Sequence, residues 1–328
     1  MTRETSLGDA CYAMLAQSLT EVAADCPDLP SSSPPLHRLR NLVLVLSASP
    51  ETTLSGPPLK LTLAGALALT SSAQKVLATL RGAGGSSRVS GEMHLALTET
   101  LAALSNQLGE ALRQKRADRV RGLYVIIDPQ ITNGRDPMEV AASAVRGGAR
   151  MLQLRDKLRD KGEILPLASA LQQLCQAYDA DLIINDHVDL AAAVGSAGIH
   201  VGQTDLPVAQ ARRVLWPHQV LGRSNHELHE MVQSQEMGAD HLAFGAIYHT
   251  GTKGVGRPPQ GVDRLREARQ ASNLPLVAIG GINAGNVAPV VEAGADAVCV
   301  TAAVGLAPDP EAATAQLVEA VRAAGGRV

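Results

Sequence analysis

Residues 122–156 of the chain have the sequence GLYVIIDPQITNGRDPMEVAASAVRGGARMLQLRD. Two short, mostly apolar runs, 122–128 and 151–156, flank a longer stretch with helical apolar spacing. Asp136-Pro137 is a typical helix start, because the aspartate caps free amides and proline loses no hydrogen bond in the first turn. Gly147-Gly148 is a typical helix stop. The stretch therefore predicts a strand, a helix and a second strand, the repeating unit of a parallel sheet.

The same alternation continues to the end of the chain. Short apolar runs, many of them β-branched, are separated by Ala- and Leu-rich stretches of helical period. The eight runs cover residues 122–128, 151–156, 181–186, 198–202, 219–225, 241–247, 275–282 and 297–304. Eight strands, each followed by a helix, in about 200 residues predict an α/β fold of the minimal (β/α)8 TIM-barrel type over residues 118–328.

Residues 1–117 have a different rhythm. Mostly helical apolar spacing is found in 5–25, 38–48, 58–80 and 91–117, with a Pro/Ser-rich linker at 25–35 and a Gly/Ser-rich turn at 81–91. We expect a small, mainly helical N-terminal domain over 1–117. Three roles are open for it: a dimerisation bundle, a docking surface for another enzyme, or a degenerate second domain. Acids, histidines and glycines do not gather at strand ends there, so we favour a role in interaction over catalysis.

Composition limits the class of partner. The 328 residues carry a net charge of −3 with both signs interspersed, which favours neither nucleic acid nor a membrane surface as partner. The four cysteines are far apart and lack zinc-ligand spacing. The N-terminus lacks a signal pattern, and the most apolar stretch, 59–69, is too short to span a bilayer. We expect a cytoplasmic protein that binds small molecules.

Polar residues follow the ends of the predicted strands, where TIM barrels hold their active sites. They are Gln153, Arg155, Asp156, Lys157, Asn185, Asp186, Gln203, Asp205, Ser224, Thr250, Thr252, Lys253, Gly280, Gly281 and Thr301. Each alone is explained as a surface pair or a turn residue. Together they place cations, carboxylates, hydroxyls and backbone donors on one rim, which suits a metal-bound pyrophosphate and a second phosphate.

Asp186 and Asp205 follow neighbouring strands, and such carboxylates suit Mg²⁺, which also takes substrate phosphate oxygens. We expect a magnesium pyrophosphate site there; a general acid/base pair is the alternative. The cations Arg155, Lys157 and Lys253 would balance the charge of a departing pyrophosphate, and nearby hydroxyls would donate hydrogen bonds to it. The glycines of AIGGI (278–282) would let a second phosphate approach the backbone amides closely. The rim histidines, His187, His200, His226 and His249, are given no catalytic role, because a lone histidine is more often structural.

Five ordered motifs at these strand ends resemble those of thiamine-phosphate synthases. They are QLRDK (153–157), INDHVDLA (184–191), GIHVGQTDLP (198–207), GAIYHTGTKGVG (245–256) and AIGGI (278–282), and the resemblance covers about residues 121–328. It implies that Gln153, Arg155, Lys157 and Asn185 contact a hydroxymethylpyrimidine pyrophosphate, with Ser224, Thr250, Thr252 and Lys253 on its pyrophosphate. It also implies Mg²⁺ on Asp186 and Asp205, and thiazole phosphate on Gly281 and the backbone at Val300 and Thr301.

The reaction implied by the resemblance joins the pyrimidine pyrophosphate to a thiazole phosphate, or to its 2-carboxylate, and gives thiamine phosphate. In the family, pyrophosphate leaves first and the thiazole nitrogen captures the pyrimidinylmethyl cation. This agrees with a site that offers charge stabilisation and positioning without a side-chain nucleophile. The catalytic residues expected on this basis are Arg155, Lys157, Ser224 and Lys253.

Three positions depart from the family pattern. Ala246 stands where the family usually has proline, His187 where it often has arginine, and Thr301 where it usually has serine. None of these changes removes a proposed metal ligand or Lys253.

Two other functions remain open from the sequence. One is a thiazole tautomerase, which needs no pyrophosphate clamp, and the other is a phosphate-binding barrel without catalysis. Retention of Asp186, Asp205 and Lys253 favours the synthase.

Overall fold

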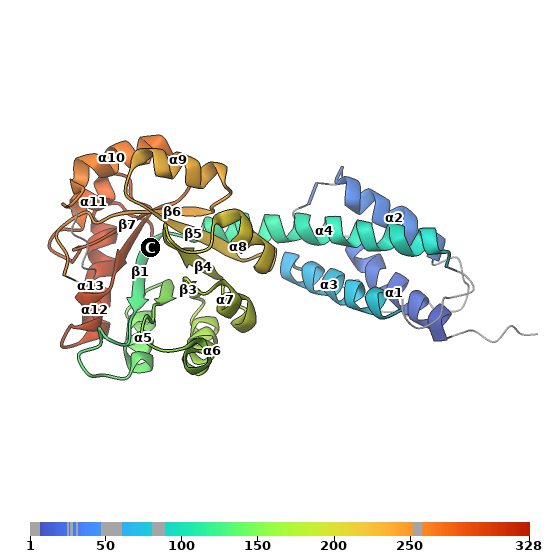
Figure 1. Cartoon of the computed structure of the whole chain (residues 1–328), viewed down its shortest axis with the longest axis horizontal. Helices are drawn as coiled ribbons and strands as arrows, with labels where there is room; N and C mark the ends of the chain where they lie inside the picture. Colours follow the sequence, from blue (N-terminus) through green and yellow to red (C-terminus); the bar gives the residue numbers. More distant parts are fainter. Residues whose placement is uncertain are drawn as a thin grey trace, which may run out of the picture. The chain divides into compact units, whose positions relative to one another are not determined.

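The computed structural model describes residues 7–24, 26, 29–30, 32–46, 61–80, 89–251 and 258–328. The chain divides into two compact units, Met1–Leu112 and Arg113–Val328. The second unit is the barrel expected from the sequence, and helices precede it (Figure 1). In the described parts of the chain, no helix is long and apolar enough to cross a membrane.

The N-terminal unit contains α1 (Leu7–Ala24), α2 (Pro34–Leu46), α3 (Leu63–Leu80) and most of α4 (Gly91–Ala117). Leucines on these helices, such as Leu19, Leu39 and Leu101, are almost fully buried in one hydrophobic core. The expected start of the second helix at residue 38 was wrong. The helix begins at Pro34, because proline in the first turn starts a helix as readily as it marks a linker. The expected turn at 81–91 falls mostly outside the described residues.

The barrel is closed and parallel, with the strands in sequence order and β8 paired with β1. Its strands are β1 (Gly122–Ile127), β2 (Met151–Leu154), β3 (Asp181–Asn185), β4 (Gly198–Val201), β5 (Val220–Asn225), β6 (His241–Gly245), β7 (Leu276–Ile279) and β8 (Ala297–Val300). Its helices are α5 (Pro137–Arg146), α6 (Lys161–Ala177), α7 (Val188–Val194), α8 (Val208–Val214), α9 (Leu228–Glu236), α10 (Gly261–Ala271), α11 (Ala288–Glu292), α12 (Ala302–Gly305) and α13 (Pro310–Ala323).

The caps expected at Asp136 and Asp309 are confirmed. Asp136 accepts a hydrogen bond from the backbone N–H of Met138, and Asp309 accepts from two N–H groups of the first turn of α13. The eighth apolar run was expected to be extended to residue 304, which was wrong. Strand β8 ends at Val300, and the remaining apolar residues form the short helix α12.

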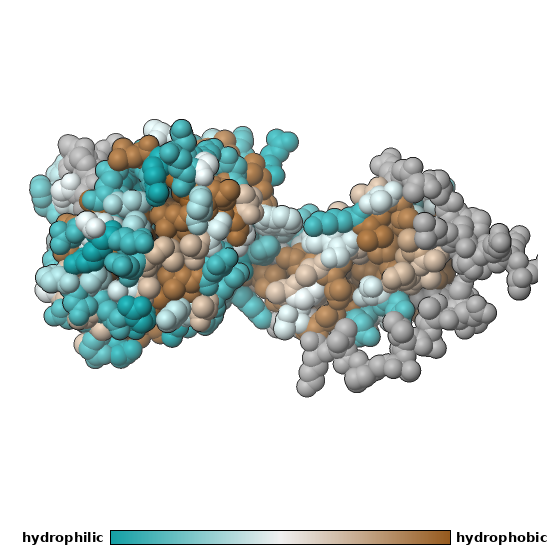
Figure 2. All heavy atoms as spheres, turned by 90° about the horizontal axis from the view of Figure 1, so that it is seen from below, coloured by the Kyte–Doolittle hydropathy of each residue, from teal (hydrophilic) through white to brown (hydrophobic). Residues whose placement is uncertain are grey.

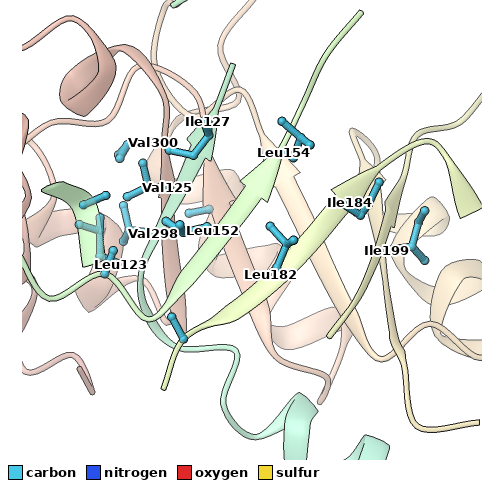
Figure 3. Close-up of a cluster of buried hydrophobic side chains, with 14 of the residues drawn as sticks. Leu123, Val125, Ile127, Leu152, Leu154, Leu182, Ile184, Ile199, Val298 and Val300 are labelled. Carbon is cyan, nitrogen blue, oxygen red and sulfur yellow. The ribbon is translucent and has the colours of Figure 1, made fainter. Parts of the chain in front are cut away.

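Alternate strand residues fill two different cores. Side chains such as Leu123, Leu152 and Ile184 point outward and pack beneath the surrounding helices (Figure 3). Side chains such as Tyr124 and Ile183 point inward and fill the barrel. Because both faces of most strands are buried, these strands are apolar runs without polar alternation, which is the pattern that reveals them in the sequence.

The barrel unit begins before β1, in the last turns of α4. Arg113 Nε donates to Asp240 Oδ1 at 3.0 Å, and Arg119 Nε donates to Asp181 Oδ2 at 2.9 Å. Asp240 also pairs with Arg212. Burial raises the pKa of Asp240 and of Asp181, while the arginines oppose the rise. These arginines therefore compensate carboxylates that would otherwise be buried without a counter-charge.

A methyl group added at Gly222 is expected to destabilise the barrel. Gly222 faces His241 across the β5–β6 pair, and a Cβ there would lie 2.0 Å from His241 Nε2. Because the imidazole is fully buried, we expect Gly222→Ala to lower the free energy of unfolding by about 1–3 kcal/mol, the usual cost of overpacking. Urea unfolding measures the change. In a His241→Ala background the same substitution should cost much less, and an equal cost there would contradict the collision.

Candidate active site

A cavity of about 200 Å³ lies at the C-terminal ends of the strands. Part of its wall consists of apolar interior side chains, including Ile126, Ala243 and Val277. The residues expected to contact substrate that line it are Gln153, Arg155, Asn185, Ser224, Thr250, Gly281, Val300 and Thr301. Lys157, Asp186 and Asp205 are not part of its lining, and Thr252 and Lys253 lie outside the described residues.

A buried carboxylate that was missed in the sequence holds Arg155 at the cavity. Asp128 follows β1, is 2 % exposed, and forms an ion pair with the Arg155 guanidinium. Asp128 also accepts a hydrogen bond from the backbone N–H of Gln130 at 3.0 Å. Because a buried carboxylate requires such partners, the pair fixes the direction of the guanidinium. Asp128 ends the apolar run 122–128 in the same way as Asp186 ends the run 181–186. This shared position is the sequence signal from which Asp128 could have been predicted.

Lys157, Asp186 and Asp205 form a charged group beside the cavity. Lys157 Nζ bonds Asp186 Oδ2, and Asp205 Oδ2 accepts from the backbone N–H of Gly202 at 2.6 Å. Burial raises the pKa of Asp186, as does the neighbouring Asp205 carboxylate, while Lys157 lowers it. The negative charge of the two carboxylates is therefore only partly compensated. In the described part of the chain, no group of three or more His, Cys, Asp or Glu side chains could hold a metal ion.

Ser224 is fixed by two residues from β4 and the loop after it. His200 Nε2 lies 2.8 Å from Ser224 Oγ. Gln203 Nε2 donates to the Ser224 carbonyl oxygen at 2.6 Å, and Arg223 Nη2 donates to Gln203 Oε1 at 3.0 Å. His200 is hydrogen-bonded, as expected of a structural histidine, but it also lines the cavity.

Gln153 and Tyr124 are two of the polar residues that line the cavity from the barrel interior. Gln153 Nε2 donates to Tyr124 Oη at 2.8 Å, and both side chains are buried. Burial raises the pKa of Tyr124 well above the ordinary phenol value of 10.0. The phenol therefore keeps its proton and can donate it, while Gln153 Oε1 can accept. Such a pair can bind a ring nitrogen and an amino group of a small heterocycle.

The loop after β7 and the end of β8 form another part of the cavity wall. Gly281 has a φ of +67°, and a Cβ there would lie 2.4 Å from the His249 carbonyl oxygen, so the position requires glycine. Asn286 Nδ2 donates to the Gly281 carbonyl oxygen at 3.0 Å and holds the turn. Together with Val300 and Thr301, this backbone lies where TIM barrels commonly bind phosphate.

Acid is expected to destabilise the barrel through His241, whose ring is fully buried at the start of β6. Burial, and to a smaller extent Arg212, lowers the pKa of His241 to about 4. An unfolded histidine has a pKa near 6.5 and binds more protons between these values. The free energy of unfolding should therefore be fully retained above about pH 6.5 and fall by up to roughly 3 kcal/mol towards pH 4. Urea unfolding against pH measures the slope. His241→Leu should reduce the slope, and an unchanged slope would contradict this assignment.

A closed (β/α)8 barrel with cations, paired carboxylates and a glycine turn at one rim defines an enzyme that acts on phosphorylated small molecules. Residues 123–304 match the family model described as thiamine monophosphate synthase. The thiamine-phosphate synthase of Moorella thermoacetica is 42% identical over 205 residues, which are 62% of this chain and 98% of that protein. The one from Shouchella clausii is 40% identical over 202 residues, 62% of this chain and 97% of that protein.

A solved structure agrees with these matches. The thiamine phosphate pyrophosphorylase of Pyrococcus furiosus has a TM-score of 0.59 and 32% identity, and the match covers 64% of this chain and 100% of that one. The chain therefore belongs to the thiamine monophosphate synthase family and is a thiamine-phosphate synthase, a transferase (EC 2.5.1.3) of thiamine biosynthesis. The fold and the function expected from the sequence are confirmed. The family match begins at residue 123 and leaves the N-terminal helices outside it.

Proposed function

We propose that the barrel joins hydroxymethylpyrimidine pyrophosphate to thiazole phosphate in the cavity at its C-terminal rim. The observation that carries this proposal is the gathering of three kinds of group around one cavity. A buried Gln153–Tyr124 pair suits an aminopyrimidine ring, the cation Arg155 suits a pyrophosphate, and the glycine turn at Gly281 suits a second phosphate. These are the recognition groups that the two substrates require.

The chain's residues act by stabilising charge and holding the reactants in place. Arg155, Lys157 and Lys253 would balance the charge of pyrophosphate as it leaves with the bonding electrons, and the hydroxyls of Ser224, Thr250 and Thr252 would donate to it. Gln153 and Asn185 would hold the pyrimidinylmethyl cation that remains. Gly281 and the backbone at Val300 and Thr301 would hold the thiazole phosphate, so that the ring nitrogen forms the new C–N bond.

Asp186 and Asp205 are the proposed ligands of Mg²⁺. They fit it because they are adjacent, carry negative charge that Lys157 compensates only in part, and would leave most of the coordination shell to water and substrate oxygens. When bound, the ion would neutralise pyrophosphate oxygens and so improve the leaving group. Asp205 is oriented for this by the Gly202 N–H, which takes one carboxylate oxygen and leaves the other for a ligand.

The choice between thiazole phosphate and its 2-carboxylate is open to a direct experiment. The full chain would be supplied with the pyrimidine pyrophosphate, Mg²⁺ and either thiazole at equal concentration, and kcat/KM would be compared for the two. Release of carbon dioxide in step with thiamine phosphate would identify the carboxylate as a substrate. Turnover of neither compound by folded protein would refute the proposed reaction.

We propose a contact surface on the N-terminal unit, and its occupant as a second copy of the chain. Figure 2 shows hydrophobic residues at the surface of these helices, where Leu44 is 71% and Leu95 is 56% exposed. Contiguous exposed apolar patches commonly mark association sites. Light scattering should give an oligomer for the full chain and a smaller mass for Leu44→Glu, with Thr79→Glu at an exposed position of α3 as the control for the added charge. A monomeric wild-type chain would refute this.

The location proposed for the reaction is the cytoplasm. Cys11 and Cys175 are free thiols, which a reducing compartment preserves. All proposed substrates are small charged molecules that such a compartment holds.

A further inference from the structure

His200 lies directly beneath one of the proposed pyrophosphate contacts. Its neighbour in register on β5 is Gly222, two residues before Ser224, so both His200 and Ser224 face the barrel interior and line the cavity. His200 is 8% exposed, and its Nε2 lies 2.8 Å from Ser224 Oγ. His200 therefore bonds the Ser224 hydroxyl from the buried side, and the opposite side of that hydroxyl faces the cavity.

The imidazole has little room to move. Gly222 has no side chain, and the ring of His241 fills that space, since a Cβ at Gly222 would meet His241 Nε2 at 2.0 Å. The rings of His200 and His241 are 6.1 Å apart between centroids and are inclined by 33°. The serine backbone is also fixed, because Gln203 Nε2 donates to its carbonyl oxygen at 2.6 Å. The hydroxyl direction is therefore set mainly by His200.

The direction of this hydrogen bond decides what Ser224 can offer to a ligand. A serine hydroxyl has one proton and two lone pairs, whereas a neutral imidazole donates from one nitrogen and accepts at the other. If Nε2 accepted the serine proton, Ser224 could present only lone pairs to the cavity, and these repel a phosphate oxygen. If Nε2–H donates to Oγ, the serine proton remains available to an anion.

We propose that His200 is a positioning residue, which donates from Nε2–H to Ser224 Oγ and thereby directs the serine proton at the pyrophosphate. This rests on the proposed function, in which Ser224 contacts that group. His200 itself touches no reacting atom. In this role His200 acts through Ser224, so its effect on pyrophosphate binding should disappear when the serine hydroxyl is absent. A side chain that places a hydrogen-bond donor near the position of Nε2 should restore the effect.

The test measures the binding of inorganic pyrophosphate with Mg²⁺ to the full chain by calorimetry, together with kcat and KM. Glutamine places an amide N–H near the position of Nε2, whereas leucine removes the donor. We expect His200→Leu to weaken pyrophosphate binding about tenfold, and His200→Gln to stay within about threefold of wild type. In a Ser224→Ala background, His200→Leu should add less than about a twofold change.

A second cavity histidine provides the matched control. His226 lines the same cavity but bonds the Gly245 carbonyl oxygen through Nδ1 at 2.8 Å. The effect of His226→Leu should therefore be the same in the wild-type and Ser224→Ala backgrounds. Equal effects of His200→Leu in both backgrounds, or no recovery with glutamine, would overturn the proposal. Failure of wild-type protein to bind pyrophosphate or form product would instead refute the proposed function.

Discussion

The substitution Asp186→Asn is expected to lower kcat/KM by at least about a hundredfold, because loss even of outer partners of metal ligands typically costs 10–100-fold. The change keeps the shape of the side chain but removes the negative charge that would hold Mg²⁺ with Asp205. It also releases Lys157 from its carboxylate partner. The assay is steady-state turnover over a range of Mg²⁺ concentrations. We expect part of the loss to be recovered at high Mg²⁺, as for weakened metal binding.

Asp189→Asn is the matched control for this loss. Asp189 lies on α7, three residues after Asp186, and its carboxylate forms an exposed ion pair with Lys161. The same chemical change at this surface carboxylate should leave kcat/KM within about twofold of wild type, because exposed ion pairs contribute little. If Asp186→Asn behaved like Asp189→Asn at every Mg²⁺ concentration, Asp186 would not be a metal ligand.

Arg155→Met is expected to reduce both activity and stability, for separate reasons. Removing a cation that stabilises a departing anion should lower kcat by about 10²–10³-fold. It also leaves Asp128, 2% exposed, without its counter-charge. Breaking a buried ion pair costs roughly 3–5 kcal/mol, and we expect the lower end, because the Arg155 side chain is 19% exposed. Turnover and urea unfolding measure the two effects independently.

The double variant Arg155→Met/Asp128→Asn separates the two effects. Without the Asp128 charge, most of the lost stability should return, whereas turnover should stay low because the cation is still missing. Arg146→Met, which breaks the exposed pair with Glu311, serves as the control and should cost less than about 1 kcal/mol. Recovery of turnover in the double variant would show that Arg155 has only a structural role.

The fold could be predicted because most of the barrel strands are buried on both faces and therefore appear as apolar runs. The boundaries were less accurate, since local sequence does not decide them. After Val300, Ala302 and Ala303 continue the apolar run, but alanine favours a helix, and these residues begin α12 after Thr301 at its N-cap. Likewise, Pro34 and Pro35 were expected to belong to a Pro/Ser-rich linker, but they form the first turn of α2.

Eight of the residues expected to contact substrate line the cavity, because parallel strands bring their C-terminal ends together. Their pairings could not be predicted, because each depends on side-chain geometry across strands that are far apart in the sequence. Arg155 was expected to face a ligand, yet it also bonds Asp128, which follows the neighbouring strand β1. His200 was set aside as structural, and its contact with Ser224 follows only from the β4–β5 register.

The most direct measurement is the condensation itself. Full-length protein would be incubated with hydroxymethylpyrimidine pyrophosphate, thiazole phosphate and Mg²⁺, and thiamine phosphate and pyrophosphate would be quantified together. We expect equal amounts of both products in the presence of Mg²⁺, with little product after chelation and with Asp205→Ala or Lys253→Ala. A folded wild-type protein that binds thiazole phosphate but forms no thiamine phosphate would contradict the proposed reaction.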